Sequence, residues 1–282
     1  IFNEIINFPQ NNLLKKISFL YNMSKKKFDY IFVLDGKERS ILSAYLVKSK
    51  NKVAISYKNI FIYKFSNIKF VKDNEEKQLN VTFQEVLNLA GINYKLTNYN
   101  FLNKKKDNKF SLNIPLKSYI HIHIDEKWFN TLYIKSYTDI NPNFIDFTNF
   151  LEKISEKKDI LVTTGLQSFD LIKKLKDNYF TKTIDNISSK KNQLNSIYLV
   201  LEPSFDDLES LLRNANTLIS CHGAVTHAAN SLNVKIIDIY EESRKAFYYK
   251  YTSYMKNHYP LYRTNFNELK NKIYKQVLNS TN

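Results

Sequence analysis

Short apolar runs alternate with amphipathic segments along most of this chain of 282 residues. Runs of strand length, such as Tyr30–Leu34 and Ser196–Leu201, are largely apolar along their length instead of at every second position. Strands of that kind are buried on both faces, which is typical of parallel sheets with helices on each side. The alternation therefore predicts an α/β fold with mostly parallel sheets.

The predicted strands are these apolar runs, namely Tyr30–Leu34, Lys52–Ser56, Ser118–Ile124, Asp159–Thr163, Ser196–Leu201, Thr217–Ser220 and Val234–Tyr240, with short extended pieces at Ile60–Tyr63 and Ile68–Val71. The predicted helices carry apolar residues three and four positions apart, and they cover Glu38–Val47, Glu75–Leu89, Asn143–Ile154, Ser168–Leu175, Phe205–Arg213, Ala224–Leu232 and Phe266–Leu278. Strand and helix thus follow one another repeatedly, as in a doubly wound fold.

A polar, lysine-rich stretch at residues 98–117 interrupts the alternation and contains a proline near its end. Such a composition is typical of a linker between domains. We therefore predict two Rossmann-like domains that face a cleft, residues 1–115 and residues 116–282. The chain lacks an initiating Met, so we expect it to begin within a domain and the first domain to be incomplete at its N-terminus.

The net charge of +15 suggests anionic partners such as nucleic acid, a membrane surface or phosphorylated substrates. Only four of the 42 basic residues are arginine, however, while Lys, Asn and Ile are heavily used. Phosphate clamps and base-reading surfaces favour the bidentate arginine fork. We therefore attribute most of the charge to biased composition. The single cysteine, Cys221, excludes an internal disulfide and favours a reducing compartment.

The richest candidate site lies at the predicted turn between the strand ending at Ser220 and the helix beginning near Ala224. Its polar and small residues are Ser220, His222, Gly223, Ala224, Val225, Thr226 and His227. Ligands of open α/β sheets bind at the carboxyl ends of strands, where a helix N-terminus offers unpaired N–H groups and a positive dipole end. Gly223 would let a diphosphate approach the backbone closely, while Thr226 and the two histidines add donors. The plainer alternative is an ordinary strand-to-helix turn with a capping glycine.

The stretch LISCHGAVTHAANSLNVKIIDIY resembles the C-terminal signature of the bacterial ADP-heptose:lipopolysaccharide heptosyltransferases (glycosyltransferase family 9). Ser220 matches the serine at the strand end, and His227 matches the histidine of that signature. The preceding LEPSFDDLESLLRNANTLIS resembles the family's approach to it. The family's Asp-Thr-Gly is replaced by His222, Gly223 and Ala224, so its acidic residue is missing. This HGA order is also reminiscent of other transferases of the GT-B fold.

Three further segments carry the same resemblance. FDYIFVLDGKERSILSAYLVKSKNKVAIS resembles a stretch of the family's N-terminal domain, and YIHIHIDEKW resembles the segment that opens its second domain. The resemblance implies that Lys127 reaches the donor phosphates, with Trp128 beside it. DILVTTG resembles the strand that leads to the donor's nucleoside pocket, which assigns Thr164 and Gly165 to donor binding.

The resemblance implies a GT-B-like fold and transfer of a heptose-like sugar from a nucleotide-diphospho-sugar to a lipopolysaccharide or surface-glycan acceptor. It implies no cofactor and no metal. The enzyme would be cytoplasmic, with peripheral contact to the anionic inner face of the membrane and no nucleic-acid partner. The general base is unassigned, because the segment expected to supply it does not occur ahead of Ile1. His121, His123 and Asp125 would share one face of a strand, but the resemblance gives them no metal to hold.

Two alternatives remain open from the sequence. A non-catalytic polyanion or nucleic-acid binder would carry a continuous basic surface stripe and would bind with steep salt dependence. A degenerate transferase fold would bind a nucleotide sugar without turnover.

Overall fold

The computed structural model describes residues 8–9, 12–57, 67–74, 76–94, 114, 116–184, 186–192 and 194–278. The chain divides into two compact units. The first consists of Ile1–Thr97 together with Tyr249–Ser253, and the second of Asn98–Tyr248 together with Tyr254–Asn282. Part of helix α8 (Lys245–Thr252) therefore belongs to the first unit, far in sequence from the rest of it.

Most of the expected linker, residues 98–117, lies outside the described residues, as does the short extended piece predicted at Ile60–Tyr63. The domain boundary expected at residue 115 therefore stays a prediction. Within the described residues, no helix is both long and apolar enough to cross a membrane.

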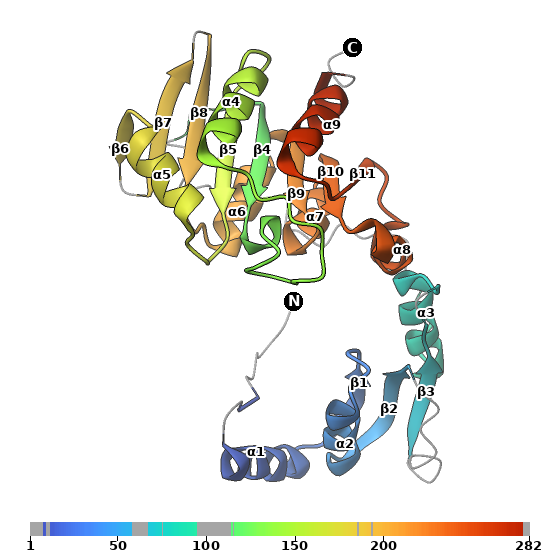
Figure 1. Cartoon of the computed structure of the whole chain (residues 1–282). Helices are drawn as coiled ribbons and strands as arrows, with labels where there is room; N and C mark the ends of the chain where they lie inside the picture. Colours follow the sequence, from blue (N-terminus) through green and yellow to red (C-terminus); the bar gives the residue numbers. More distant parts are fainter. Residues whose placement is uncertain are drawn as a thin grey trace. The chain divides into compact units, whose positions relative to one another are not determined.

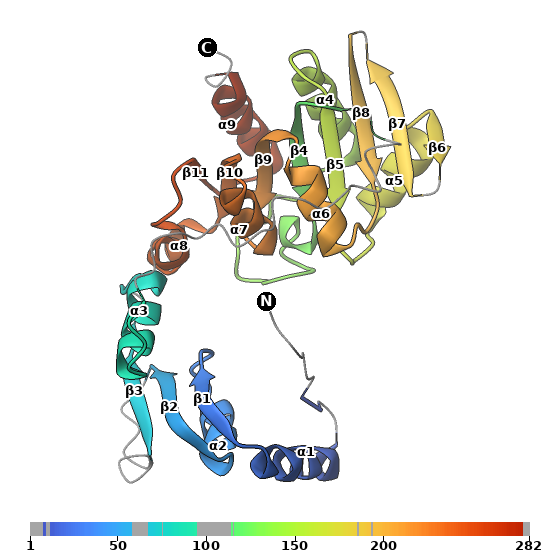
Figure 2. The same cartoon turned by 180° about the vertical axis from the view of Figure 1, so that it is seen from behind.

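The first unit contains a parallel sheet in the order β1-β2-β3 (Figures 1 and 2). Its elements are α1 (Leu13–Lys25), β1 (Phe28–Val33), α2 (Glu38–Leu46), β2 (Ser49–Ser56), β3 (Ile68–Lys72) and α3 (Leu79–Leu89). Successive residues of β2 face opposite sides: Ala54 packs with Ile41 of α2, and Val53 packs with Val86 of α3. The two helices therefore cover opposite faces of the small sheet.

A buried ion pair ties α8 to the rest of the first unit. Nζ of Lys250 donates to the carboxylate of Asp73 and, over 2.9 Å, to the carbonyl oxygen of Asn74. Asp73 also accepts a hydrogen bond of 2.8 Å from the hydroxyl of Thr82. Both charged side chains are almost fully buried. Each charge is stable there because the other neutralises it.

The second unit is built on an eight-stranded sheet in the order β11-β10-β9-β4-β5-β8-β7-β6. Its strands are β4 (Tyr119–Ile124), β5 (Ile160–Thr164), β6 (Lys182–Ile184), β7 (Ile187–Asn192), β8 (Asn195–Val200), β9 (Ala215–Cys221), β10 (Lys235–Tyr240) and β11 (His258–Tyr262). All neighbouring strands pair in parallel except β6 with β7 and β7 with β8. The predicted α/β class with mostly parallel sheets is therefore confirmed.

Helices cover both faces of this sheet (Figures 1 and 2). They are α4 (Phe144–Ser155), α5 (Asp170–Asn178), α6 (Phe205–Leu212), α7 (Ala224–Ser231) and α9 (Phe266–Leu278), with 3-10 turns η2 (Glu126–Trp128) and η3 (Glu242–Arg244). One core joins α4, α5 and α9 to the sheet, and a second joins α6 and α7 to it. Ile219 of β9 lies in the first core and Leu218 in the second, as the alternation along a strand requires.

The chain order creates a switch point in the middle of the larger sheet. From β4 the chain proceeds to β5 and β8 on one side, then returns to β9 on the other side and continues outward to β10 and β11. The connections on the two sides use helices on opposite faces. The carboxyl ends of β4 and β9 therefore flank this switch point, which is where open α/β sheets bind ligands.

The structure adds elements that the sequence patterns did not predict, namely α1, α8, β6, β7 and β11. It also shortens one predicted helix. The side-chain oxygen of Asn74 accepts from the backbone N–H of Glu76 and Lys77 over 3.1 and 2.8 Å, which closes a turn ahead of the helix. As a result, α3 begins at Leu79 and not at Glu75.

Candidate functional site

Three loops meet at the carboxyl edge of the larger sheet, because β4, β5 and β9 are parallel neighbours there. The loop after β4 carries Lys127, the loop after β5 carries Gly165, and the turn after β9 carries Gly223. The structure therefore brings the three sequence motifs of the second unit to one edge of one sheet.

The turn after β9 leads directly into α7. Gly223 is the N-cap residue, and the backbone N–H groups of Ala224 and Val225 lie in the first helical turn, where a helix offers no internal acceptor. Gly223 adopts an extended backbone with φ of −179°, which any residue can adopt. Its missing side chain matters for a different reason: a methyl group there would lie 3.1 Å from Nζ of Lys127. The glycine thus keeps the space between the helix N-terminus and the lysine open.

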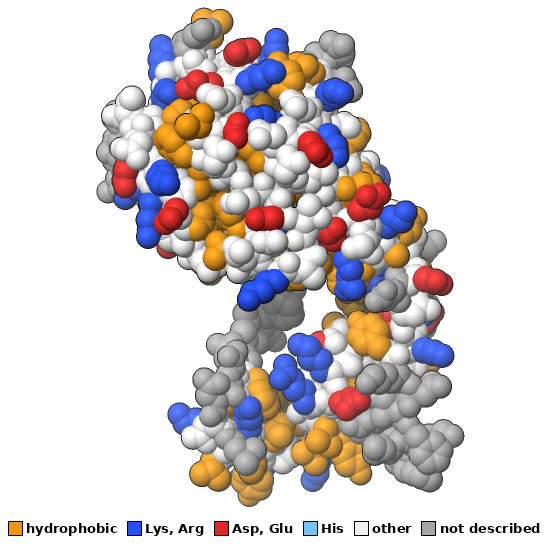
Figure 3. All heavy atoms as spheres, in the orientation of Figure 1, with side chains coloured by type: hydrophobic (Ala, Val, Ile, Leu, Met, Phe, Trp, Pro, Cys, Tyr) orange, Lys and Arg blue, Asp and Glu red, His pale blue; other side chains and the backbone are white. Residues whose placement is uncertain are grey.

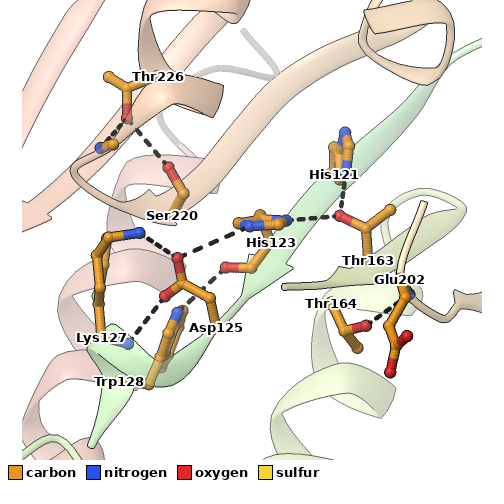
Figure 4. A network of polar contacts seen from close by, with 12 residues as sticks. His121, His123, Asp125, Lys127, Trp128, Thr163, Thr164, Glu202, Ser220 and Thr226 are labelled. Carbon is orange, nitrogen blue, oxygen red and sulfur yellow. Dashed lines mark hydrogen bonds and ion pairs between the residues drawn. The ribbon is translucent and has the colours of Figure 1, made fainter. Parts of the chain in front are cut away.

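Lys127 is held in place by its neighbours after β4. Asp125 accepts the backbone N–H of Lys127 over 3.1 Å and forms an ion pair with its Nζ (Figure 4). Burial by itself disfavours the charge of Lys127, but the Asp125 carboxylate outweighs it and raises the pKa of the lysine. Trp128, fully buried, donates from Nε1 to the carbonyl oxygen of His123 over 3.1 Å and so fixes the loop on the strand.

Thr164 and Gly165 lie at the end of β5. The hydroxyl of Thr164 accepts the backbone N–H of Glu202 over 2.9 Å, and Glu202 itself has a positive φ of 46°. A methyl group on Gly165 would come within 2.9 Å of Cβ of Asp125. Gly165 therefore allows the Asp125 loop to pass close to β5. In this structure both residues position loops at the carboxyl edge of the sheet. Their contact with a donor nucleoside stays a prediction.

Ser220 and Thr226 are fully buried beneath the turn. The hydroxyl of Thr226 accepts the backbone N–H of Gly223 over 3.2 Å and lies 3.4 Å from the hydroxyl of Ser220 (Figure 4). It also donates to Asp238 over 3.3 Å. These contacts account for the polar atoms of both side chains within the protein. They build the turn, and a direct contact of either residue with a ligand stays a prediction.

The two histidines of the turn have different surroundings. Nδ1 of His222 lies 2.7 Å from the carboxylate of Asp238 on the neighbouring strand β10. Nδ1 of His227 instead lies 2.9 Å from the hydroxyl of Tyr254. Burial first, and the nearby His222 second, lower the pKa of His227 to about 4, against the opposing effect of Asp238. His227 is therefore neutral near pH 7 and can contribute only a neutral hydrogen bond.

His121 and His123 both point to Thr163 on the neighbouring strand (Figure 4). Nε2 of His121 and Nδ1 of His123 lie 2.7 and 2.9 Å from the threonine hydroxyl. Asp125 continues that face, as the sequence predicted, with 3.8 Å between its carboxylate and Nε2 of His123. Across the described part of the chain, however, no group of three or more His, Cys, Asp or Glu residues is arranged to hold a metal ion.

These two buried histidines predict a loss of stability in mild acid. Burial, reinforced by His123, lowers the pKa of His121 to about 3, and burial together with Lys127 lowers that of His123 to about 4. Both folded-state values lie below the ordinary 6.5, so the unfolded chain binds more protons and stability falls as pH drops below that value. At pH 5 we expect each histidine to cost about 2 kcal/mol of unfolding free energy. Urea unfolding at pH 7.5 and pH 5 measures the difference.

The variant His121→Gln separates this effect from general acid denaturation. Glutamine keeps a polar group near the position of Nε2 but does not titrate, so the decline between the two pH values should shrink by about 2 kcal/mol. An unchanged decline in the variant would show that His121 is not the cause.

Sequence patterns missed three residues that support this site. Asp238 in the middle of β10 is fully buried and contacts the site histidine. His258 of β11 lies 2.9 Å from the same carboxylate. Arg263 follows β11, is nearly buried, and donates to the carbonyl oxygens of Lys127 and Thr138 over 2.5 and 2.7 Å. The pattern of a lone polar residue inside an apolar strand, as at Asp238, was the one available signal.

Solved structures with the same overall fold are glycosyltransferases. A family 9 glycosyltransferase from Veillonella parvula DSM 2008 superposes with a TM-score of 0.62 at 14% identity, covering 94% of this chain and 73% of that one. The E. coli heptosyltransferase WaaC with ADP-2-deoxy-2-fluoro heptose gives 0.57 at 11% identity, covering 94% and 79%. The E. coli ADP-heptose lipopolysaccharide heptosyltransferase II gives 0.57 at 10% identity, covering 94% and 81%.

No protein-family model matches the sequence, and no curated protein sequence does either. The likeness is therefore one of three-dimensional structure, spread over nearly the whole chain at identities of 10 to 14% in these three cases. It agrees with the motifs at the carboxyl edge of the larger sheet and with the two α/β units. The chain thus has the GT-B-like fold of the family 9 glycosyltransferases, the fold that its sequence motifs predicted.

Proposed function

We propose that this protein transfers a glycosyl unit from a nucleotide-diphospho-sugar to an acceptor hydroxyl, and that the donor diphosphate binds at the turn after β9. The observation that carries the proposal is the meeting of Lys127 with the N-terminus of α7 across Gly223. A lysine ammonium and unpaired backbone amides facing a side-chain-free position form a site suited to an anion.

The arrangement fits the electrostatic problem of glycosyl transfer. As the bond between sugar and diphosphate breaks, negative charge grows on the leaving diphosphate while the sugar becomes positive. In this proposal, Lys127, the amides of Ala224 and Val225, and His222 stabilise that growing charge. Arg263 stabilises the position of Lys127, because it donates a charge-assisted hydrogen bond of 2.5 Å to the carbonyl oxygen of that residue.

The similar structures support a more specific proposal for the donor and the acceptor. Two of them are heptosyltransferases, one of which is described with an ADP-heptose analogue. We therefore propose an ADP-heptose-like donor and a lipopolysaccharide or other lipid-linked or surface-glycan acceptor, handled on the cytoplasmic side of the membrane. The proposal leaves the general base unassigned.

A thermal-shift panel of nucleotide sugars tests donor binding, followed by measurement of nucleoside diphosphate release in the presence of glycan acceptors. We expect a nucleotide-diphospho-sugar to raise the melting temperature in a concentration-dependent way, as ligands of the native state do. Stabilisation without release would favour a fold that binds the donor without turnover. A complete lack of stabilisation by all donors would contradict the proposal.

Removing the charge of Lys127 should weaken donor binding. A charge-assisted hydrogen bond contributes about 1.5–3 kcal/mol, so Lys127→Met should lower donor affinity by roughly 10- to 100-fold. Lys127→Arg keeps the charge and should lose less. Lys235→Met is the matched control, because Lys235 is the first residue of β10 and lies at the amino ends of the strands, away from the carboxyl edge that carries the site. An equal effect of the two methionine variants in a titration with ADP-glucose would show that general charge, and not this site, governs binding.

The polyanion-binding alternative makes a different prediction. On the face shown in Figure 3, the described Lys and Arg side chains of the second unit are interspersed with Asp and Glu and form no continuous stripe. A binder of nucleic acid would lose affinity steeply with salt in proportion to the phosphates contacted. Tight, steeply salt-dependent binding of random duplex DNA that survives Lys127→Met would favour that alternative.

A further inference from the structure

Asp238 is a fully buried carboxylate in β10, where its neighbours within residues 236–240 are all buried. Burying a charged carboxylate is costly unless donors surround it. Its Oδ2 atom lies 2.7 Å from Nδ1 of His222 and 2.9 Å from Nε2 of His258, and its Oδ1 atom accepts from the hydroxyl of Thr226 over 3.3 Å. The carboxylate therefore connects the turn after β9, helix α7 and the edge strand β11.

The geometry determines where the histidine protons lie. Burial alone would raise the pKa of Asp238, but the hydrogen bonds from His222 and His258 outweigh it and lower the pKa. An ionised carboxylate only accepts hydrogen bonds, so both rings must donate to it. His222 thus carries its proton on Nδ1, and its Nε2 atom is the position where a further proton can bind.

The other titratable side chains packed around His222 stay uncharged near neutral pH. From α7, His227 contacts its ring edge-on at 5.3 Å between centroids, and the pKa of His227 lies near 4. From β10, burial and the charge of Asp238 raise the pKa of Tyr240 to about 12. From α8, Tyr248 lies at 5.0 Å, and burial with the hydrogen bond to Tyr137 raises its pKa as well.

Lys127 and Arg263 are cations at this edge, and both are engaged within the protein: Arg263 donates to two backbone carbonyl oxygens. Lys127 forms an ion pair with Asp125, which compensates its charge before any ligand arrives. A bound diphosphate carries more negative charge than the helix N-terminus, with about half a positive charge, can balance. An added proton on the histidines that share Asp238 would supply the missing charge directly beside Gly223.

We propose that His222, Asp238 and His258 form a proton-accepting unit beside the turn after β9. In this unit, His222 takes up a proton at Nε2 when a diphosphate binds and releases it when the diphosphate leaves. The inference rests on the proposed function, since it concerns the same donor site. The proton comes from solvent and returns there. Asp238 and His258 are positioning residues that set the tautomer and the charge of His222. Donor affinity therefore falls as pH rises.

Isothermal titration calorimetry with ADP-glucose and UDP-glucose in buffers of different ionisation enthalpy tests this unit, because neither diphosphate titrates itself near neutral pH. We expect uptake of up to about one proton per donor bound, with affinity falling up to about tenfold per pH unit on the alkaline side. His222→Gln should abolish the uptake and leave affinity independent of pH. His227→Gln, in the same turn, should keep the uptake whatever it does to affinity.

Variants of the positioning residues separate this role from a structural one. Asp238→Asn should shift the pH midpoint of donor affinity to lower values, since it removes the charge that stabilises a protonated His222. His258→Asn should shift the midpoint to higher values, since it leaves the Oδ2 atom of Asp238 to His222 alone. His258→Asn covers the case in which Asp238→Asn does not fold. Donor binding without proton uptake, or uptake retained in His222→Gln, would overturn this inference and leave the proposed function standing. If neither ADP-glucose nor UDP-glucose binds, this inference and the proposed function are both overturned.

Discussion

Replacing Gly223 by aspartate should lower donor affinity at least about a hundredfold, which corresponds to about 2.8 kcal/mol. The new carboxylate would stand at the N-terminus of α7 and within reach of Lys127, since a methyl group at this position already lies 3.1 Å from Nζ of that residue. It would occupy the anion site with its own negative charge and repel a diphosphate. Titration with ADP-glucose, monitored by calorimetry, measures the loss.

Gly223→Ala is the matched control. The extended backbone of Gly223 accepts any residue, and the nearest atom to the new methyl group is the flexible end of Lys127. We therefore expect a normal melting temperature and a much smaller loss of affinity than in Gly223→Asp. If the aspartate variant melts normally and still binds the donor as the wild type does, the diphosphate does not bind at this turn.

Breaking the ion pair between Asp73 and Lys250 should destabilise the first unit by about 3–5 kcal/mol, because either single substitution leaves a buried charge without its partner. Lys250→Met removes the donor to both Asp73 and Asn74, and Asp73→Ala removes the acceptor of Lys250 and Thr82. Urea unfolding followed by tyrosine fluorescence and circular dichroism should show an early transition of this unit in either variant.

Two further variants test the cause of that loss. The double variant Asp73→Leu with Lys250→Met leaves no unpaired charge and should be more stable than either single variant. Lys50→Met removes a surface pair with Asp29, whose side chains are 80% and 72% exposed, and should leave the unfolding transition unchanged. Single variants as stable as the wild type would show that the buried pair contributes nothing to this unit.

The core strands of both units were predictable because their apolar runs are continuous and long. β4, β5, β8, β9 and β10 all lie where the sequence placed a strand, to within a few residues. β7 and β11 were missed for physical reasons. β7 reads ISSKKN and pairs in an antiparallel hairpin, and β11 is an edge strand that contains Pro260, which an edge tolerates and a central strand does not.

The turn at Gly223 was predictable from local signals, namely an apolar strand, a glycine and a helix start within a few residues. The approach of Lys127 to that turn was expected from the resemblance, and the structure places its Nζ beside Gly223. Asp238 and His258 could not be connected to His222 from the sequence, because they lie 16 and 36 positions further along the chain on separate strands.

The sequence by itself determined the α/β class, the strand-to-helix turn and the residues that this turn carries, since each depends on neighbours within a few positions. Only the tertiary structure decided that β10 and β11 lie in succession beside β9, and that their side chains reach the turn. The local pattern of a parallel strand records that it is buried, but not which strand lies next to it. The lateral order of the sheet therefore converts an isolated histidine in a glycine-containing turn into one member of a buried His–Asp–His unit.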